Sequence, residues 1–196
     1  SSVILLAAAS AVFGQDGVFT PMKGTAKPSF QRSDEIGRCL VFDTHVVKTT
    51  PSDDGGENVK IWDREGKSAG TKACEIKAYP YITINDADNN SFYGFSVDYF
   101  FIDTGTSAGT RTLFIYNTDS GYEITKVDYQ NEPSLVGGRF LMYDEPTDKK
   151  GPISTCPQAA KWKREGGSVG WVQGKKMDLK TETTTNVGIF RCVYVE

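Results

Sequence analysis

The sequence predicts an all-β fold, an antiparallel β-barrel of about 8–10 strands, with a β-sandwich as the alternative. From Arg38 onward apolar and polar residues alternate, and in residues 92–102 the odd positions are all aromatic or apolar. Aromatic residues make up 12% of the chain and glycine occurs 20 times, a mixture that favours strands and turns over helices. Short connections with turn signals such as Gly166-Gly167 indicate antiparallel neighbours. The aromatic face of residues 92–102 is bulky enough to fill the interior of a small barrel, which favours a barrel over a sandwich.

The first 37 residues precede this alternating pattern. Residues 1–14 contain an apolar run and the sequence Ala9-Ser10-Ala11, which fits an A-x-A cleavage site. The run is shorter than the about 20 residues of a membrane-spanning helix. We interpret residues 1–14 as a signal-peptide remnant, or as a retained segment that packs on the domain or inserts into a neighbouring subunit. Residues 15–37, without a sustained period, predict an extended arm before a single β domain over residues 38–196.

Within this domain the alternating runs predict the individual strands. A charged turn after residues 59–62 leads to a second run, residues 74–84, in which the even positions are mostly apolar. Further strands are predicted over residues 92–102, 110–117, 122–130, 135–144, 169–173, 177–181 and 187–195. Residues 157–165 break the pattern: they begin with a proline and precede Gly166, and therefore predict one short helix.

The four cysteines, Cys39, Cys74, Cys156 and Cys192, predict two disulfides, because their number is even and none shows C-x-x-C spacing. Four cysteines allow three pairings. We prefer Cys39 with Cys192, which would join the first and last strands, and Cys74 with Cys156. Disulfides are typical of secreted proteins, so we expect an extracellular location. Asn89-Asn90-Ser91 forms an N-glycosylation sequon in a predicted turn, which makes Asn89 a candidate glycosylation site.

Three short stretches occur in an order that resembles a known family. They are VFD at residues 41–43, WDREGKSAGTKAC at residues 62–74 and SLVGGRFLMYD at residues 134–144. The order is similar to that of the allene-oxide-cyclase and dirigent barrels, although Arg139 follows the two glycines where that family has T-G. The resemblance implies an antiparallel barrel of about eight strands, often oligomeric, with an apolar cavity. The catalytic residues of the family have no counterparts that can be placed here, so none is assigned.

Composition and motifs exclude several classes of function for this chain. The net charge is −3 and basic residues are scattered among acidic ones, so we expect no nucleic-acid partner. A single histidine, His45, excludes mechanisms that need two, and no G-x-S-x-G, Walker or Rossmann motif occurs. His45 and Asp43 would share one strand face, but Leu40 and Phe42 favour the other face as the inner one. We therefore expect no catalytic residue, and binding rather than catalysis.

Four side chains are candidates for ligand binding. Arg139 and Arg191 occupy positions of apolar strand parity, and an inward arginine needs a carboxylate partner or an anionic ligand. The alternative is a bulge that turns them outward. Tyr93 and Tyr99 could line a cavity, although a packed core is the simpler interpretation.

Asp86 and Asp88, with Asn90, have the D-x-D-x-N spacing of a calcium loop. An EF-hand is excluded because its sixth and twelfth positions hold Ser91 and Val97. We expect no resident cofactor or metal, with loosely bound calcium at this turn as an alternative.

The leading hypothesis is a secreted binding protein for a small apolar ligand, a glycan or another protein chain. A self-assembling extracellular structural protein, forming a homo-oligomer through its N-terminal segment, and a cyclase-type enzyme are the alternatives.

Overall fold

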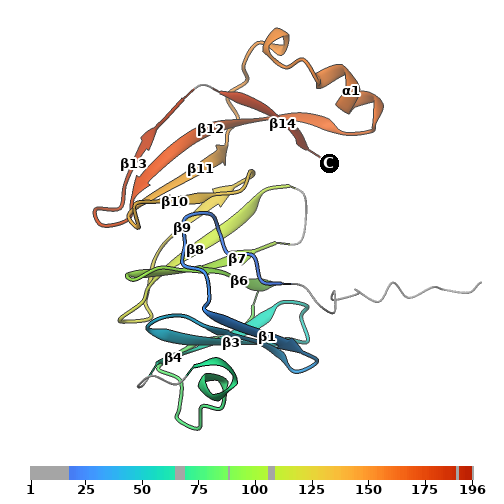
Figure 1. Cartoon of the computed structure of the whole chain (residues 1–196). Helices are drawn as coiled ribbons and strands as arrows, with labels where there is room; N and C mark the ends of the chain where they lie inside the picture. The colour runs from blue at the N-terminus through green and yellow to red at the C-terminus, as the bar shows by residue number, and fades with distance from the viewer. Residues whose placement is uncertain (1–17, 65–68, 88, 106–108, 189, 196) are drawn as a thin grey trace, which may run out of the picture.

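The computed structural model describes residues 18–64, 69–87, 89–105, 109–188 and 190–195, whose strands form three antiparallel sheets stacked face to face (Figure 1). The first sheet contains β1 (Phe30–Asp34), β2 (Gly37–Val41), β3 (His45–Pro51), β4 (Glu57–Asp63) and β5 (Ile82–Ile84). The middle sheet contains β6 (Asn90–Phe95), β7 (Tyr99–Thr104), β8 (Arg111–Asn117) and β9 (Glu123–Tyr129). The third sheet contains β10 (Ser134–Val136), β11 (Phe140–Pro146), β12 (Ser168–Asp178), β13 (Thr183–Asn186) and β14 (Arg191–Val195). The first and middle sheets are therefore meanders, whereas in the third sheet both β13 and β14 pair with the long strand β12.

The all-β prediction is confirmed, whereas the closed barrel is wrong: among the described strands, none of the three sheets closes on itself. Strand β7 shows why. Tyr99 and Phe101 face the third sheet, while Phe100 and Ile102 face the first sheet, and every residue of β7 is buried. A strand that is apolar on both faces needs cover on both sides, which a barrel open to solvent on its outside does not supply. The fold extends the predicted alternative, a sandwich, by one layer.

Two apolar cores separate the three layers. The core between the middle and third sheets contains Met22, Tyr99, Phe101, Leu113, Ile115, Val127, Tyr129, Leu135, Leu141, Tyr143, Met177 and Leu179. The core between the first and middle sheets contains Phe19, Leu40, Phe42, Val47, Val59, Ile61, Ile82, Phe92, Phe95, Phe100 and Ile102. Each sheet pair thus buries a continuous apolar surface, which is the main stabilising term of such packing.

Several predicted strands prove to be hairpins or loops. Residues 92–102 were predicted as one strand, but Ser96-Val97-Asp98 form the turn between β6 and β7, where Val97 is 80% exposed. Residues 135–144 are likewise split by Gly137 and Gly138, whose φ angles of 60° and 67° suit the tight turn of a hairpin. Of residues 74–84, only the last three form a strand. A turn or a loop thus replaces part of each strand that alternation alone predicted.

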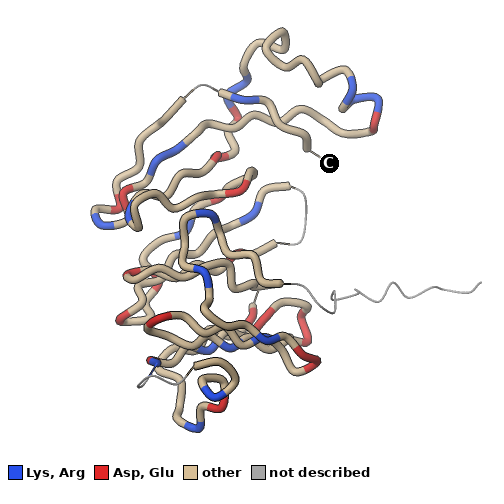
Figure 2. Tube along the Cα trace, in the orientation of Figure 1, with Lys and Arg blue, Asp and Glu red and all other residues tan. Residues whose placement is uncertain are grey.

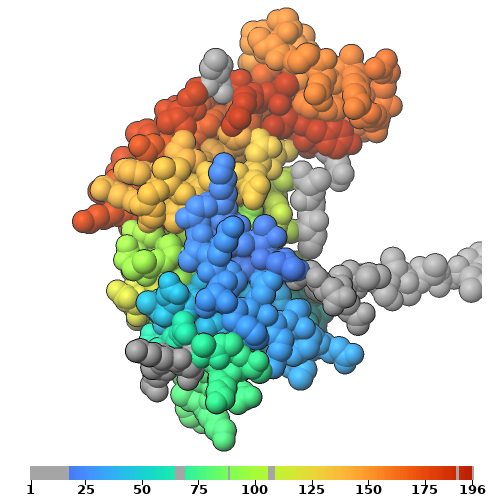
Figure 3. Space-filling model, in the orientation of Figure 1, coloured from blue at the N-terminus to red at the C-terminus, as the bar shows by residue number. Residues whose placement is uncertain are grey.

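The segment before β1 is packed into the stack. The Met22 backbone N–H donates to Tyr93 O at 2.8 Å and the Ala26 N–H to Phe95 O at 2.7 Å, which covers the free edge of β6. Leu135 N–H donates to Lys23 O at 2.8 Å and thereby ties this segment to β10. In Figure 3 the blue segment accordingly runs across the middle layer to the yellow one. Strand β1 lies inside the predicted arm, so the first sheet begins before residue 38. The predictions for residues 1–14 fall outside the described residues.

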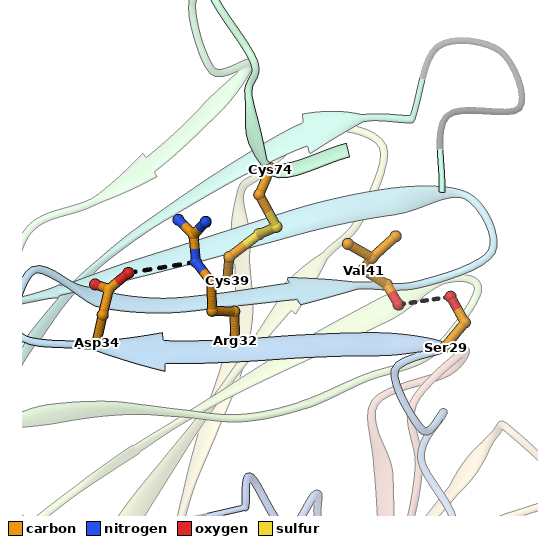
Figure 4. Close-up of a disulfide and its surroundings, with 6 residues drawn as sticks. All are labelled: Ser29, Arg32, Asp34, Cys39, Val41 and Cys74. Atoms are coloured by element: carbon orange, nitrogen blue, oxygen red, sulfur yellow. Dashed lines mark hydrogen bonds and ion pairs between the residues drawn. A yellow bond between two sulfur atoms is a disulfide. The ribbon is translucent and has the colours of Figure 1, made fainter. Parts of the chain in front are cut away.

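The chain forms two disulfides, as predicted, but the preferred pairing is wrong: Cys39 is bonded to Cys74 and Cys156 to Cys192. Figure 4 shows the first bond between β2 and the short helix η1 (Gly70–Cys74), beside the Ser29–Val41 hydrogen bond that fixes the start of β1. Cys39 and Cys192 cannot pair because they belong to the two outer sheets, with the middle sheet between them.

The predicted helix over residues 157–165 is confirmed as α1 (Ala159–Arg164), which follows the short helix η2 (Ile153–Thr155). Its Ala159 packs with Cys156 and Trp171 in a small cluster against β12. The Cys156–Cys192 disulfide therefore attaches the helical segment to the outer part of the third sheet.

Candidate functional site

The side chains predicted to bind a ligand do not converge on one site. Arg139 lies in the β10–β11 turn, where its Nε donates to Asp178 Oδ1 at 2.7 Å, and this contact lowers the pKa of Asp178. Burial raises the pKa of Tyr99, and the charges of Asp178 and Arg139 act on it in opposite directions. Arg191, in β14, instead forms an ion pair with the buried Asp144. Both arginines are substantially exposed, which agrees with the outward alternative rather than the inward one, and each has a carboxylate partner within the chain.

Tyr93 lies near a different polar cluster, between the middle and third sheets. Asp103 is 1% exposed, and its carboxylate accepts a 2.6 Å hydrogen bond from the Tyr129 hydroxyl and forms an ion pair with Arg111. Burial raises the pKa of Tyr93, with a further contribution from Glu132. A buried carboxylate needs such partners because an unpaired charge is costly in an apolar layer. This cluster therefore serves the packing of the two sheets.

The turn predicted to hold calcium is organised around Asp86. Its carboxylate accepts hydrogen bonds from Gly56 N at 3.0 Å, Asn90 N at 2.6 Å and the Ser52 hydroxyl. Within the described ranges no group of three or more acidic, histidine or cysteine side chains is placed to hold an ion. Asp88 lies outside the described residues, and calcium binding at this turn stays a prediction.

Asn89, the sequon asparagine, is half-buried and has a φ of 58°. Its glycosylation stays a prediction.

A groove of about 330 Å³ opens on the outer face of the first sheet, where none of the predicted ligand residues lies. Its lining residues belong to the end of β4, helix η1 and the loop that leads to β5. Figure 1 shows these segments at the outer side of the first sheet. The groove is lined by Val46, Trp62, Asp63, Arg64, Lys72, Ala73, Glu75, Ile76, Lys77, Ala78, Tyr79 and Tyr81. The sequence pattern does not indicate this groove, because residues 74–84 alternate like a strand, whereas most of them form this loop.

One disulfide and three hydrogen bonds hold the loop of the groove in place. The Cys39–Cys74 disulfide fixes its start, and the Trp62 indole Nε1–H donates to Ala78 O at 2.9 Å. At its end, the Tyr81 backbone N–H donates to Ile61 O at 3.1 Å, and the Tyr81 hydroxyl donates to Thr118 O, also at 3.1 Å. The groove is therefore built on a fixed frame, as binding sites on loops require.

The lining combines aromatic rings with charges of both signs. Tyr79 is 96% exposed and Tyr81 is 40% exposed, although both are large apolar rings. Of the described residues, three bases and two acids line the groove, and Figure 2 shows basic and acidic positions alternating along the connection that contains η1. Burial, together with Asp63 and Asp119, raises the pKa of Tyr81.

His45 lies behind this groove and contacts two of its lining residues. Its Nε2 is 3.3 Å from Asp63 Oδ1 and its Nδ1 is 2.7 Å from Thr44 Oγ1. Its ring packs on Phe95 and Tyr81, with ring centroids 4.7 and 5.8 Å apart. The predicted outward orientation of His45 is thus wrong.

The turn between β2 and β3, which the hydrogen bond from the Phe42 N–H to His45 O closes, explains this difference. Because the chain reverses there, Phe42 and His45 face the same side of the sheet although they are three residues apart. The partner of His45 is Asp63 rather than Asp43, which is exposed.

We expect His45 to make stability depend on pH. Burial lowers the pKa of His45 below its ordinary value of 6.5, and the charges of Asp63 and Asp119 offset only part of this effect. Between the two pKa values the unfolded chain binds more protons, so the free energy of unfolding falls as pH decreases below about 6.5. Denaturation of the wild type and of His45→Gln from pH 5 to 8 should show this slope in the wild type alone. The single histidine should titrate by NMR with a midpoint below 6.5, and a higher midpoint would contradict the argument.

No protein-family model matches the chain, and neither curated proteins nor solved structures give a match. The resemblance to the allene-oxide-cyclase and dirigent barrels stays a prediction. Among the helices of the described ranges, none has the length and hydrophobicity needed to cross a bilayer. The chain is thus an antiparallel, disulfide-stabilised β protein.

Proposed function

We propose that this chain is an extracellular protein that acts by binding, and that the groove beside the Cys39–Cys74 disulfide is its ligand site. Two disulfides support an oxidising compartment. The observation that carries the proposal is the exposure of Tyr79 on a loop that is otherwise held firmly. Tyrosine on a fixed loop of a β scaffold gives a large contact area at low entropic cost, which is what binding surfaces use.

Binding is a better proposal than catalysis because of the groove's side chains. Among its described lining residues there is no serine, threonine, cysteine or histidine to act as nucleophile or general base, and Asp63, one of its two acids, is paired with His45. Of the described lining residues, His45 contacts Asp63 and Tyr81, and its ring packs on Phe95 of the middle sheet. Self-assembly through residues 1–14 stays an alternative proposal, because those residues lie outside the described ranges.

The proposal can be tested without knowing the ligand. The isotope-labelled, disulfide-bonded chain would be titrated with a library of sugars, short peptides and apolar fragments. We expect at least one class to shift the Trp62 indole N–H signal and the amide signals of residues 75–81, because these groups line the groove. Tyr79→Ser should weaken such binding, and Tyr122→Ser, equally polar but at the exposed β8–β9 turn, should not. If no class perturbs these signals, the groove is not the ligand site.

A further inference from the structure

We infer that the groove binds a neutral saccharide, an inference that rests on the proposed function and specifies its ligand. The first argument is charge. Among the described lining residues, the acids Asp63 and Glu75 stand beside the bases Lys72, Lys77 and Arg64, which gives this part of the lining a net charge of about +1 over five groups of mixed sign. A strongly charged ligand would meet like charges as well as opposite ones. The groove therefore favours neither a positively nor a negatively charged ligand.

The second argument is desolvation. An apolar ligand would take water away from the charged side chains that line the groove and give them no hydrogen-bond partner in return, which is costly. A hydroxyl group is both donor and acceptor. It can accept from Lys72 or Lys77 and donate to Glu75 or Asp63. A ligand rich in hydroxyl groups therefore satisfies both signs of charge without carrying charge itself.

The third argument concerns the two exposed rings and the size of the groove. Tyr79 and Tyr81 present apolar surface at its rim, and a sugar ring has an apolar face of C–H groups that can pack on them. The volume of about 330 Å³ lies at the lower end of the range for small-molecule sites. A protein partner, by contrast, needs about 800 Å² of contact on each side. A short saccharide, or the end of a longer one, fits this space best.

The test uses the folded, disulfide-bonded chain on an array of neutral glycans, acidic glycans and peptides, followed by calorimetry on the sugars that bind. We expect binding of neutral glycans, with a dissociation constant that stays constant between about 0.05 and 0.5 M salt, because no net ligand charge is screened. Tyr79→Ser should weaken binding about fivefold, through loss of one ring contact. Tyr122→Ser should leave it unchanged.

The outcomes separate this inference from the proposed function. If only acidic glycans, peptides or apolar fragments shift the groove signals, the saccharide inference is wrong and the groove remains a binding site. If neutral glycans bind but Tyr79→Ser has no effect, they bind elsewhere and the inference is also wrong. If no class of ligand shifts the groove signals, both the saccharide inference and the proposed function are wrong.

Discussion

Replacing Phe101 with alanine should lower the free energy of unfolding by about 3–5 kcal/mol, the usual cost of removing a buried phenylalanine. Phe101 is 0% exposed, pairs with Ile115 across the middle sheet and contributes to the core shared with the third sheet. Its loss leaves a cavity between two layers that cannot close easily, because each sheet is fixed by its own ladder of hydrogen bonds. Urea denaturation followed by circular dichroism measures the change.

Two control variants make this result informative. Phe100→Ala, on the opposite face of β7, should cost a similar amount because Phe100 is also 0% exposed and stacks on Tyr116 at 4.8 Å. Val97→Ala, in the exposed turn, should change stability by less than about 0.5 kcal/mol. A loss below about 1 kcal/mol for Phe101→Ala would show that the third sheet does not pack on β7 as described.

Removing the first disulfide with the double variant Cys39→Ser/Cys74→Ser should cost about 4 kcal/mol, the chain-entropy value for a loop of this length. The two cysteines are 35 residues apart, and the bond restricts the unfolded chain accordingly. The bond also fixes the start of the groove loop, so binding in the groove should weaken at temperatures where the variant is still folded. Chemical denaturation and groove titration measure the two effects separately.

The second disulfide supplies the matched control. Cys156→Ser/Cys192→Ser opens a loop of nearly equal length, with a separation of 36 residues, and should cost a similar free energy while leaving the groove intact. Peptide mapping without reduction should recover Cys39 linked to Cys74. Recovery of Cys39 linked to Cys192 would contradict both the pairing and the stacking of three sheets.

Local patterns predicted what depends on local chemistry. Alternating side chains predicted strands, Gly166 and the proline at residue 157 bounded the short helix, and an even number of cysteines predicted two disulfides. The candidate site was not predicted, because alternation also occurs by chance in loops. In residues 74–84 the exposed Tyr79 was part of an apparent strand, and only the fold shows it on a loop.

By itself the sequence determined an all-β chain with two disulfides, since side-chain periodicity and cysteine number are properties of neighbouring residues. Only the tertiary structure decided how many layers form, which cysteines meet and where the groove lies. Alternation shows that a strand has two faces but not what covers them. For β7 both faces are covered, and this places Cys39 and Cys192 on opposite sides of the middle sheet, where they cannot bond.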